Sequence, residues 1–181
     1  MFSVAENMLS RPEHEYTIVT PFGGQPFEEP HRSKYLILHD EHQRVCEFAG
    51  WDFINGSMGD DAARPFPWND DDTEWLVEWL GDTLVDFDEW WVPYGIHHPD
   101  HILVRSACAG IGCPTAKYRL YEELPYRVLY PMVGGHFFTR PPQGYDPSNL
   151  QKKKELCRMY GSQVDDQLER CLYVPERLWS W

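Results

Sequence analysis

The sequence predicts an α/β fold: a Rossmann-like, doubly wound sheet whose strands are mainly parallel. Short apolar or β-branched runs alternate with segments of helical periodicity, which is typical of such a sheet. The 181 residues correspond to one domain with one core, so we expect a single α/β domain over 1–181. A hydrophobic content of 42% excludes a wholly disordered chain.

In the first part of the chain, proline and glycine separate the expected strands and helices. A β-branched run at 16–20 ends at Pro21 and predicts a strand. The segment 34–50 is ambiguous, because its start resembles a strand while its later apolar residues share one helical face, with Gly50 as C-cap. The other elements expected here are a helix at 3–9, a loop at 22–30, a strand at 51–54 and a loop at 55–69.

In the second part, the clearest helix is expected from Asp71, which makes a capping box with Glu74. This helix runs to about Leu84 and has leucines at 76, 80 and 84 on its inner face. The lysines at 152–154 are expected on a solvated helix face, and His39 and His42 on a helix surface. The remaining expected elements are a strand at 87–92, a helix at 101–111, a strand at 117–121, a helix from an Asp146 N-cap to 160 and a helix from Ser162, paired with Asp165, to Pro175.

The acidic excess is concentrated in one segment. The formal net charge is −13, and residues 60–91 hold 11 of the 29 acidic residues but a single basic residue, Arg64. Such a segment is either a surface for a basic partner or the solvated face of an amphipathic helix, and we favour the helix face. The aspartates at 70–72 lack the glycine and the distal glutamate of an EF-hand calcium loop.

The composition also bears on partners and compartment. No apolar run approaches the roughly 20 residues needed to cross a bilayer, and the N-terminus lacks the pattern of a secretory signal. Without such a signal we expect a cytoplasmic protein, and in that reducing compartment the five cysteines, an odd number, are expected to be free thiols. A long basic footprint is absent, and no nucleic-acid partner is expected.

The densest group of ligand-type side chains lies at 94–101, Tyr-Gly-Ile-His-His-Pro-Asp-His. It follows the strongest expected strand and precedes a helix, and ligands bind outside the carboxyl ends of strands in open α/β sheets. Three histidines and an aspartate there can bind a metal ion, and a carboxylate can hold an imidazole by a hydrogen bond. The residues alone therefore predict a functional site and leave its chemistry open.

This turn and its surroundings resemble the PIG-L/LmbE-like N-acetylglucosaminyl de-N-acetylase family. The Gly-x-x-His-Pro-Asp-His turn at 95–101 is similar to the second motif of the family, and 121–126 is similar to its Tyr-Glu-Asp-x-Pro-Tyr segment. Residues 152–163 are similar to its C-terminal helix with Tyr-x-Ser-Gln, and 175–179 to its Glu-Arg-aromatic close. With weaker similarity at 16–24 and 41–51, the resemblance spans about 16–179.

The resemblance implies a zinc-dependent hydrolase that deacetylates an N-acetyl amino sugar or glycoconjugate. It places His101 on the metal, His98 as general acid or oxyanion stabiliser, and Asp100 as the residue that orients His98. Zinc with an open position polarises an amide carbonyl, and an adjacent protonated histidine stabilises the oxyanion. The expected substrate-binding residues are Tyr94, Glu122 and Tyr126, although Glu122 and Tyr126 are equally compatible with loop packing.

One motif of the family is absent. Family members begin with a strand ending in Ala-His-Pro-Asp-Asp-Glu, which supplies two further metal ligands and the general base, and no such string occurs here. We therefore expect an N-terminally incomplete domain without its first strand. Leu38 also stands where the family often has an arginine that faces the site. The expected partners are a small-molecule N-acetyl sugar or glycoconjugate substrate, and either a second copy of the chain or a complementing chain.

Three other sites compete for these residues. Cys108 and Cys113 with a histidine of the turn would form a structural zinc site, but their spacing is loose. His98 and Asp100 with His136 would form an iron triad, which suits a different fold. Cys113 with His136 would form a nucleophile pair that lacks a third group.

Three hypotheses about function remain at this point. The chain is an active deacetylase, a non-catalytic homologue that binds a sugar or a protein, or a truncated or split product that is inactive alone.

Overall fold

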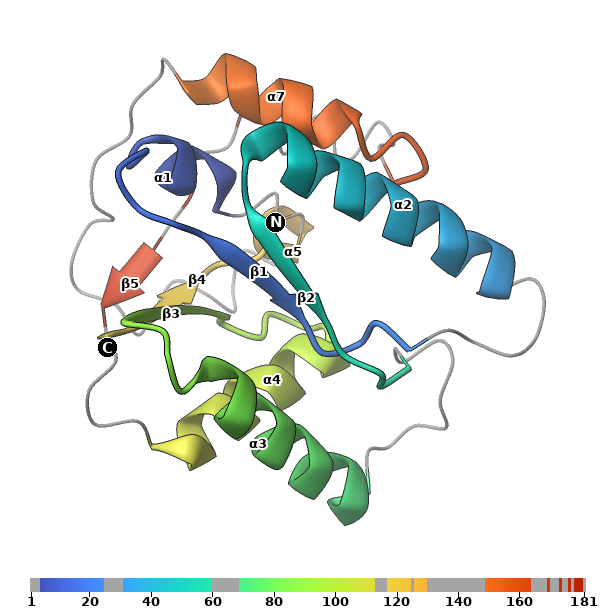
Figure 1. The fold of residues 1–181 in the computed structure, drawn as a ribbon, viewed down its shortest axis with the longest axis vertical. Helices are drawn as coiled ribbons and strands as arrows, with labels where there is room; N and C mark the ends of the chain where they lie inside the picture. The colour runs from blue at the N-terminus through green and yellow to red at the C-terminus, as the bar shows by residue number, and fades with distance from the viewer. Residues whose placement is uncertain are drawn as a thin grey trace. The chain divides into compact units, whose positions relative to one another are not determined.

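The computed structural model describes residues 4–24, 31–59, 69–112, 117–124, 126–129, 149–163, 169, 173, 176 and 178–180. These residues form an α/β fold of parallel strands and helices, which confirms the predicted fold class (Figure 1). The chain divides into two compact units. The first comprises Met1–Arg64 and Gly144–Pro175, and the second comprises Pro65–Gln143 and Glu176–Trp181.

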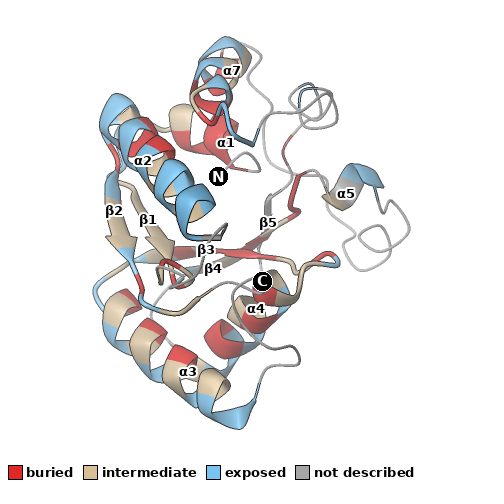
Figure 2. Ribbon diagram, turned by 90° about the vertical axis from the view of Figure 1, so that its right-hand side faces the viewer, coloured by how far each residue is buried: buried red, intermediate tan, exposed pale blue. Residues whose placement is uncertain are grey.

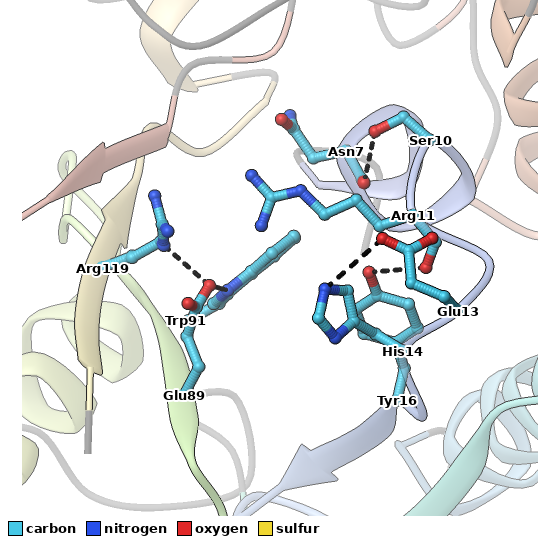
Figure 3. A network of polar contacts seen from close by, with 9 residues as sticks. All are labelled: Asn7, Ser10, Arg11, Glu13, His14, Tyr16, Glu89, Trp91 and Arg119. Carbon is cyan, nitrogen blue, oxygen red and sulfur yellow. Dashed lines mark hydrogen bonds and ion pairs between the residues drawn. The ribbon is translucent and has the colours of Figure 1, made fainter. Parts of the chain in front are cut away.

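The first unit contains a parallel strand pair covered by helices. Strand β1 (Thr17–Thr20) pairs with β2 (Asp52–Asn55), close to the two expected positions. Helix α2 (His31–Ala49) contacts β2, and α7 (Leu150–Arg158) contacts both α2 and α1 (Ala5–Leu9) (Figure 1). Side-chain bonds hold the chain between α1 and β1, since Ser10 Oγ donates to the Asn7 carbonyl and Tyr16 Oη to the Arg11 carbonyl (Figure 3).

The ambiguous segment 34–50 is helical throughout, and Gly50 ends the helix. Gly50 has a φ of +70°, and its amide donates to the carbonyl of Glu47. The amide of Trp51 donates to the carbonyl of Cys46. These two bonds form a Schellman motif, which needs a left-handed residue after the helix and favours glycine there. The first residues of the segment, although their sequence resembles a strand, are therefore part of helix α2.

Two expectations for surface residues of this unit are wrong. Lys153 is fully buried, and its Nζ lies 3.6 Å from Oε1 of Glu6 in α1. His42 is partly buried, with Nδ1 2.8 Å from Oη of Tyr160 and its ring centroid 4.4 Å from that of Phe53. The partners are distant in the sequence, so helical periodicity gives no sign of them.

The second unit contains a three-stranded sheet in the order β3-β4-β5. Strands β3 (Glu89–Pro93) and β4 (Lys117–Tyr121) are parallel, and β5 (Leu178–Ser180) is antiparallel to β4. Helices α3 (Asp70–Leu84) and α4 (Pro99–Ile111) pack on each other, α4 packs on β3, and the short α5 (Tyr126–Leu129) follows β4. Stripes of buried residues along α3 and α4 form the core of this unit (Figure 2).

Helix α3 begins earlier than predicted. Oδ1 of Asn69 accepts a hydrogen bond from the amide of Asp72 at 2.8 Å, and Oδ2 of Asp72 accepts one from the amide of Asn69 at 3.3 Å. This capping box takes the place of the expected pair Asp71 and Glu74, because asparagine caps a helix as well as aspartate does. The predicted inner face of this helix is confirmed, since its three leucines are buried, at 76, 80 and 84.

An ion pair and two hydrogen bonds donated by tryptophan side chains hold β3 in the sheet and against α3. Nε of Arg119 lies 2.6 Å from Oε1 of Glu89, and Nε1 of Trp91 donates to the same oxygen (Figure 3). The neighbouring side chain, Trp90, is buried and donates from Nε1 to the carbonyl of Leu84 at 3.1 Å. Strand β3 thus has a fixed position from which the following turn starts.

Some sequence predictions lie outside the described residues. They concern Asp146 as N-cap, most of the expected helix from Ser162 to Pro175, and the candidate ligands Cys113 and His136. Across the described ranges, no helix combines the length and the apolar character needed to cross a membrane.

Candidate active site

The candidate site begins in the turn between β3 and α4. Gly95 has a φ of +83°, and a Cβ on it would lie 3.1 Å from Cα of Ile102 in α4. His97 has a φ of +69°, which is uncommon for a residue other than glycine. The turn therefore brings the backbone close against α4 at a position where only glycine fits without adjustment.

Helix α4 begins two residues earlier than predicted. His98 is the N-cap residue, and Pro99 is the first helical residue, a position that needs no amide hydrogen. Asp100 lies in the first turn and is 4% exposed. A carboxylate there is stabilised by the partial positive charge of the helix N-terminus. The His-Pro-Asp-His sequence thus places one histidine just before the helix and the other in its first turn.

Three of the six predicted site residues have their rings together. The ring centroids of His98 and His101 are 4.7 Å apart. The Tyr126 ring, from α5, is 5.5 Å from that of His98 and meets that of His101 edge to face at 5.7 Å. The side chain of His101 is 33% exposed, so a ligand from solution can reach it.

A buried carboxylate, that of Glu123, connects this turn to the end of β4. Its Oε1 accepts hydrogen bonds from the amides of Gly95 at 2.7 Å and Ile96 at 3.0 Å. The same oxygen lies 3.2 Å from Nδ1 of His101. The side chain of Glu123 is 1% exposed, so it is part of the site framework rather than of the surface.

Sequence reasoning missed Glu123 and chose its neighbour. Strands β3 and β4 are parallel, with Pro93 opposite Tyr121, so their carboxyl ends meet at one edge of the sheet. Residues that follow β4 therefore lie beside the turn that follows β3. This pairing of strand ends is the signal that could have identified Glu123 from the sequence.

The other predicted site residues have different surroundings. Tyr94 is held to α4, because Nη1 of Arg105 donates to its carbonyl at 2.7 Å and the guanidinium lies 5.4 Å from the centroid of its ring. Glu122 is as deeply buried as Glu123. Burial, and then the charge of Glu123, raises the pKa of the Tyr121 phenol, which keeps this hydroxyl protonated.

The donor set fits zinc only in part. A catalytic zinc site has three protein ligands, and a ligating histidine holds its other nitrogen against a carboxylate or carbonyl. His101 has that arrangement, with Nδ1 beside Glu123. Among the described residues, however, no group of three or more His, Cys, Asp or Glu side chains is placed to hold a metal ion. Burial raises the pKa of Cys108 to about 12, so this thiol is neutral near pH 7.

Comparisons with solved structures identify the fold as one found in deacetylases. A deacetylase–teicoplanin complex from the teicoplanin biosynthesis pathway matches with a TM-score of 0.76 and 17% identity, over 98% of this chain and 91% of that chain. The zinc-inhibited form of teicoplanin deacetylase matches with a TM-score of 0.71 and 18% identity, over 90% of this chain and 79% of that chain. N,N′-diacetylchitobiose deacetylase from Pyrococcus horikoshii matches with a TM-score of 0.58 and 16% identity, over 95% and 69%.

No family model and no curated protein matches the sequence. At identities of 16–18% the likeness establishes the fold of the chain.

Proposed function

We propose that the chain is a hydrolase that removes the acetyl group from an N-acetyl amino sugar or glycoconjugate. The observation that carries this proposal is the cluster of His98, His101 and Tyr126 beside the carboxyl ends of two parallel strands. The His-Pro-Asp-His turn resembles that of the de-N-acetylases. The fold likeness to deacetylases, one of them named for N,N′-diacetylchitobiose, supports the same reaction.

In this proposal His98 is the proton donor. Hydrolysis of an amide builds negative charge on the carbonyl oxygen, and the amine needs a proton before it can leave. A protonated His98 hydrogen-bonds the oxygen and then transfers its proton to the nitrogen. The resemblance gives Asp100, which is buried in the first turn of α4, the role of orienting His98. Tyr126 contacts both histidine rings and borders the sugar.

We also propose that His101 is one ligand of a zinc ion whose other ligands come from outside the described residues. Zinc held there would supply a Lewis acid that polarises the amide carbonyl. Metal analysis of the purified protein tests this assignment. We expect zinc in the wild type and its loss in His101→Ala, and an unchanged metal content in that variant would exclude His101 as a ligand.

The activity test is acetate release from N-acetylglucosamine and N,N′-diacetylchitobiose, with zinc supplied. His98→Asn should lower kcat/KM by about 10²–10⁴-fold, the usual contribution of a positioned acid. His97→Asn is the matched control, because His97 is exposed in the same turn and asparagine tolerates its positive φ. Activity that survives His98→Asn, or is lost equally in His97→Asn, would refute the role given to His98.

A second candidate function is binding of an N-acetyl sugar without turnover. The observation that favours it is the incomplete ligand set within the part of the chain that the structure describes. Calorimetric titration with N-acetylglucosamine separates the two candidates. Heat of binding without acetate release at saturating zinc would support the binding protein and refute the hydrolase.

A further inference from the structure

The side chain of Glu123 cannot easily move away from His101. Its Oε1 is held by two consecutive backbone amides, those of Gly95 and Ile96, at 2.7 and 3.0 Å. Those amides belong to the turn that leads into α4, and His101 lies in the first turn of that helix. The carboxylate is therefore fixed to the same piece of backbone that carries the imidazole.

Two buried polar atoms of this pair lack hydrogen-bond partners within the described residues. They are Nδ1 of His101 and Oε2 of Glu123. The approach of Nδ1 to Oε1, at 3.2 Å, is within ion-pair distance but does not have the alignment of a hydrogen bond. A buried polar atom without a partner is unfavourable, because it has lost its hydrogen bonds to water. A small rotation of the ring or the carboxylate joins the two groups, so Glu123 is the natural acceptor for His101.

An ionised carboxylate only accepts hydrogen bonds, whereas a neutral imidazole carries its proton on one of two nitrogens. We propose that Glu123 is a positioning residue that holds His101 as the Nδ1–H tautomer. Nε2 then keeps its electron pair and faces away from the carboxylate. The use of that electron pair as a metal ligand rests on the proposed function; the tautomer itself does not.

The alternative is that Glu123 serves only to brace the turn through the two amides. In that case its charge would be irrelevant to His101. Glu123→Gln separates the two roles, because the amide oxygen still accepts from the turn while the negative charge beside Nδ1 is lost. A neutral amide oxygen is a weaker acceptor than a carboxylate, so the balance shifts toward the opposite tautomer, with the proton on Nε2.

The test is the 15N spectrum of the histidine rings in the metal-free, 15N-labelled protein at pH 8, where exposed imidazoles are neutral. A His101→Gln sample assigns the His101 signals. We expect a protonated Nδ1 in the wild type and a shift toward protonated Nε2 in Glu123→Gln. Glu122→Gln is the matched control, since it makes the same change on the adjacent, equally buried carboxylate and should leave the His101 tautomer unchanged.

Predominant Nε2–H in the wild type would overturn the proposal, whether or not any variant folds. An identical tautomer in Glu123→Gln and the wild type would also overturn it. As a second readout, zinc affinity measured by chelator competition should fall about 10–100-fold in Glu123→Gln and stay unchanged in Glu122→Gln. Failure of the wild type to bind zinc would count against the proposed function and leave the tautomer result standing.

Discussion

Replacing His42 by glutamine should remove a pH-dependent part of the stability of the first unit. Burial lowers the pKa of His42 from 6.5 to about 4, and nearby positive groups, His39 among them, act in the same direction. The ring packs on Phe53 and its Nδ1 lies 2.8 Å from Oη of Tyr160. The folded chain therefore keeps this imidazole neutral at a pH where an unfolded chain takes up a proton.

The direction of the change in stability follows from which state, folded or unfolded, takes up a proton first as pH falls. As pH falls below 6.5, the unfolded state binds a proton first, so unfolding becomes easier. The contribution of His42 is fully present above pH 6.5 and is lost as pH falls toward 4. Between pH 7.5 and 5.5 the loss amounts to about 1.3 kcal/mol, and over the whole range to about 3 kcal/mol.

The assay is urea denaturation of the wild type and His42→Gln at pH 5.5, 6.5 and 7.5, followed by circular dichroism. Glutamine keeps a polar group for Tyr160 but does not titrate. The stability of the wild type relative to the variant should fall by about 1.3 kcal/mol from pH 7.5 to 5.5. His14→Gln is the control, because His14 is exposed and its replacement should preserve the wild-type pH dependence.

If the difference in the free energy of unfolding between the wild type and His42→Gln stays constant over this pH range, the reasoning is refuted. It would mean that water reaches the ring of His42 in the folded state as it does in the unfolded chain. The same loss of pH dependence in His14→Gln would also refute it, because the effect would then not come from burial.

Two further predictions concern the backbone and the core of the second unit, and urea denaturation checks both. Gly95→Ala should destabilise by about 1–3 kcal/mol, because its φ is +83° and the new Cβ would lie 3.1 Å from Ile102. Gly81→Ala, where a Cβ meets nothing within 4 Å in α3, should instead stabilise by about 0.5–1 kcal/mol; effects of the same sign would contradict the geometry of the turn. Leu76→Ala should cost about 2–5 kcal/mol because its side chain is 0% exposed. Val85→Ala, at 64% exposed, should change stability by less than about 0.5 kcal/mol, and equal costs would contradict the assigned inner face of α3.

Local patterns were sufficient for much of the fold. The leucines of α3, the strand at 117–121 and the turn after β3 were predicted from spacing and from turn residues, because each depends on neighbours within a few positions. The turn at 94–101 was predicted as a functional site from residue types alone. The structure brings together two of its histidines and Tyr126, three residues that the resemblance had singled out.

Contacts between distant parts of the chain could not be predicted in this way. From the sequence, Lys153 is expected to be one of three solvated lysines. In the structure it is buried beside Glu6 of α1. His42 is expected from the sequence to be a surface histidine, but in the structure it contacts Tyr160, which follows α7. Glu123 is separated from Gly95 by 28 positions, and only the pairing of two parallel strands makes them neighbours.

The register of β3 and β4 makes spacing as important to this site as residue identity. Glu123 lies beside Gly95 because Pro93 faces Tyr121, and each residue follows its strand by two positions. One residue inserted between Tyr121 and Glu123 would displace the carboxylate by about 3.3 Å and direct it to the opposite face. A related chain could therefore retain every residue of the site and still lack the site. The interval between the end of β4 and the glutamate is the property to compare first among relatives of this chain.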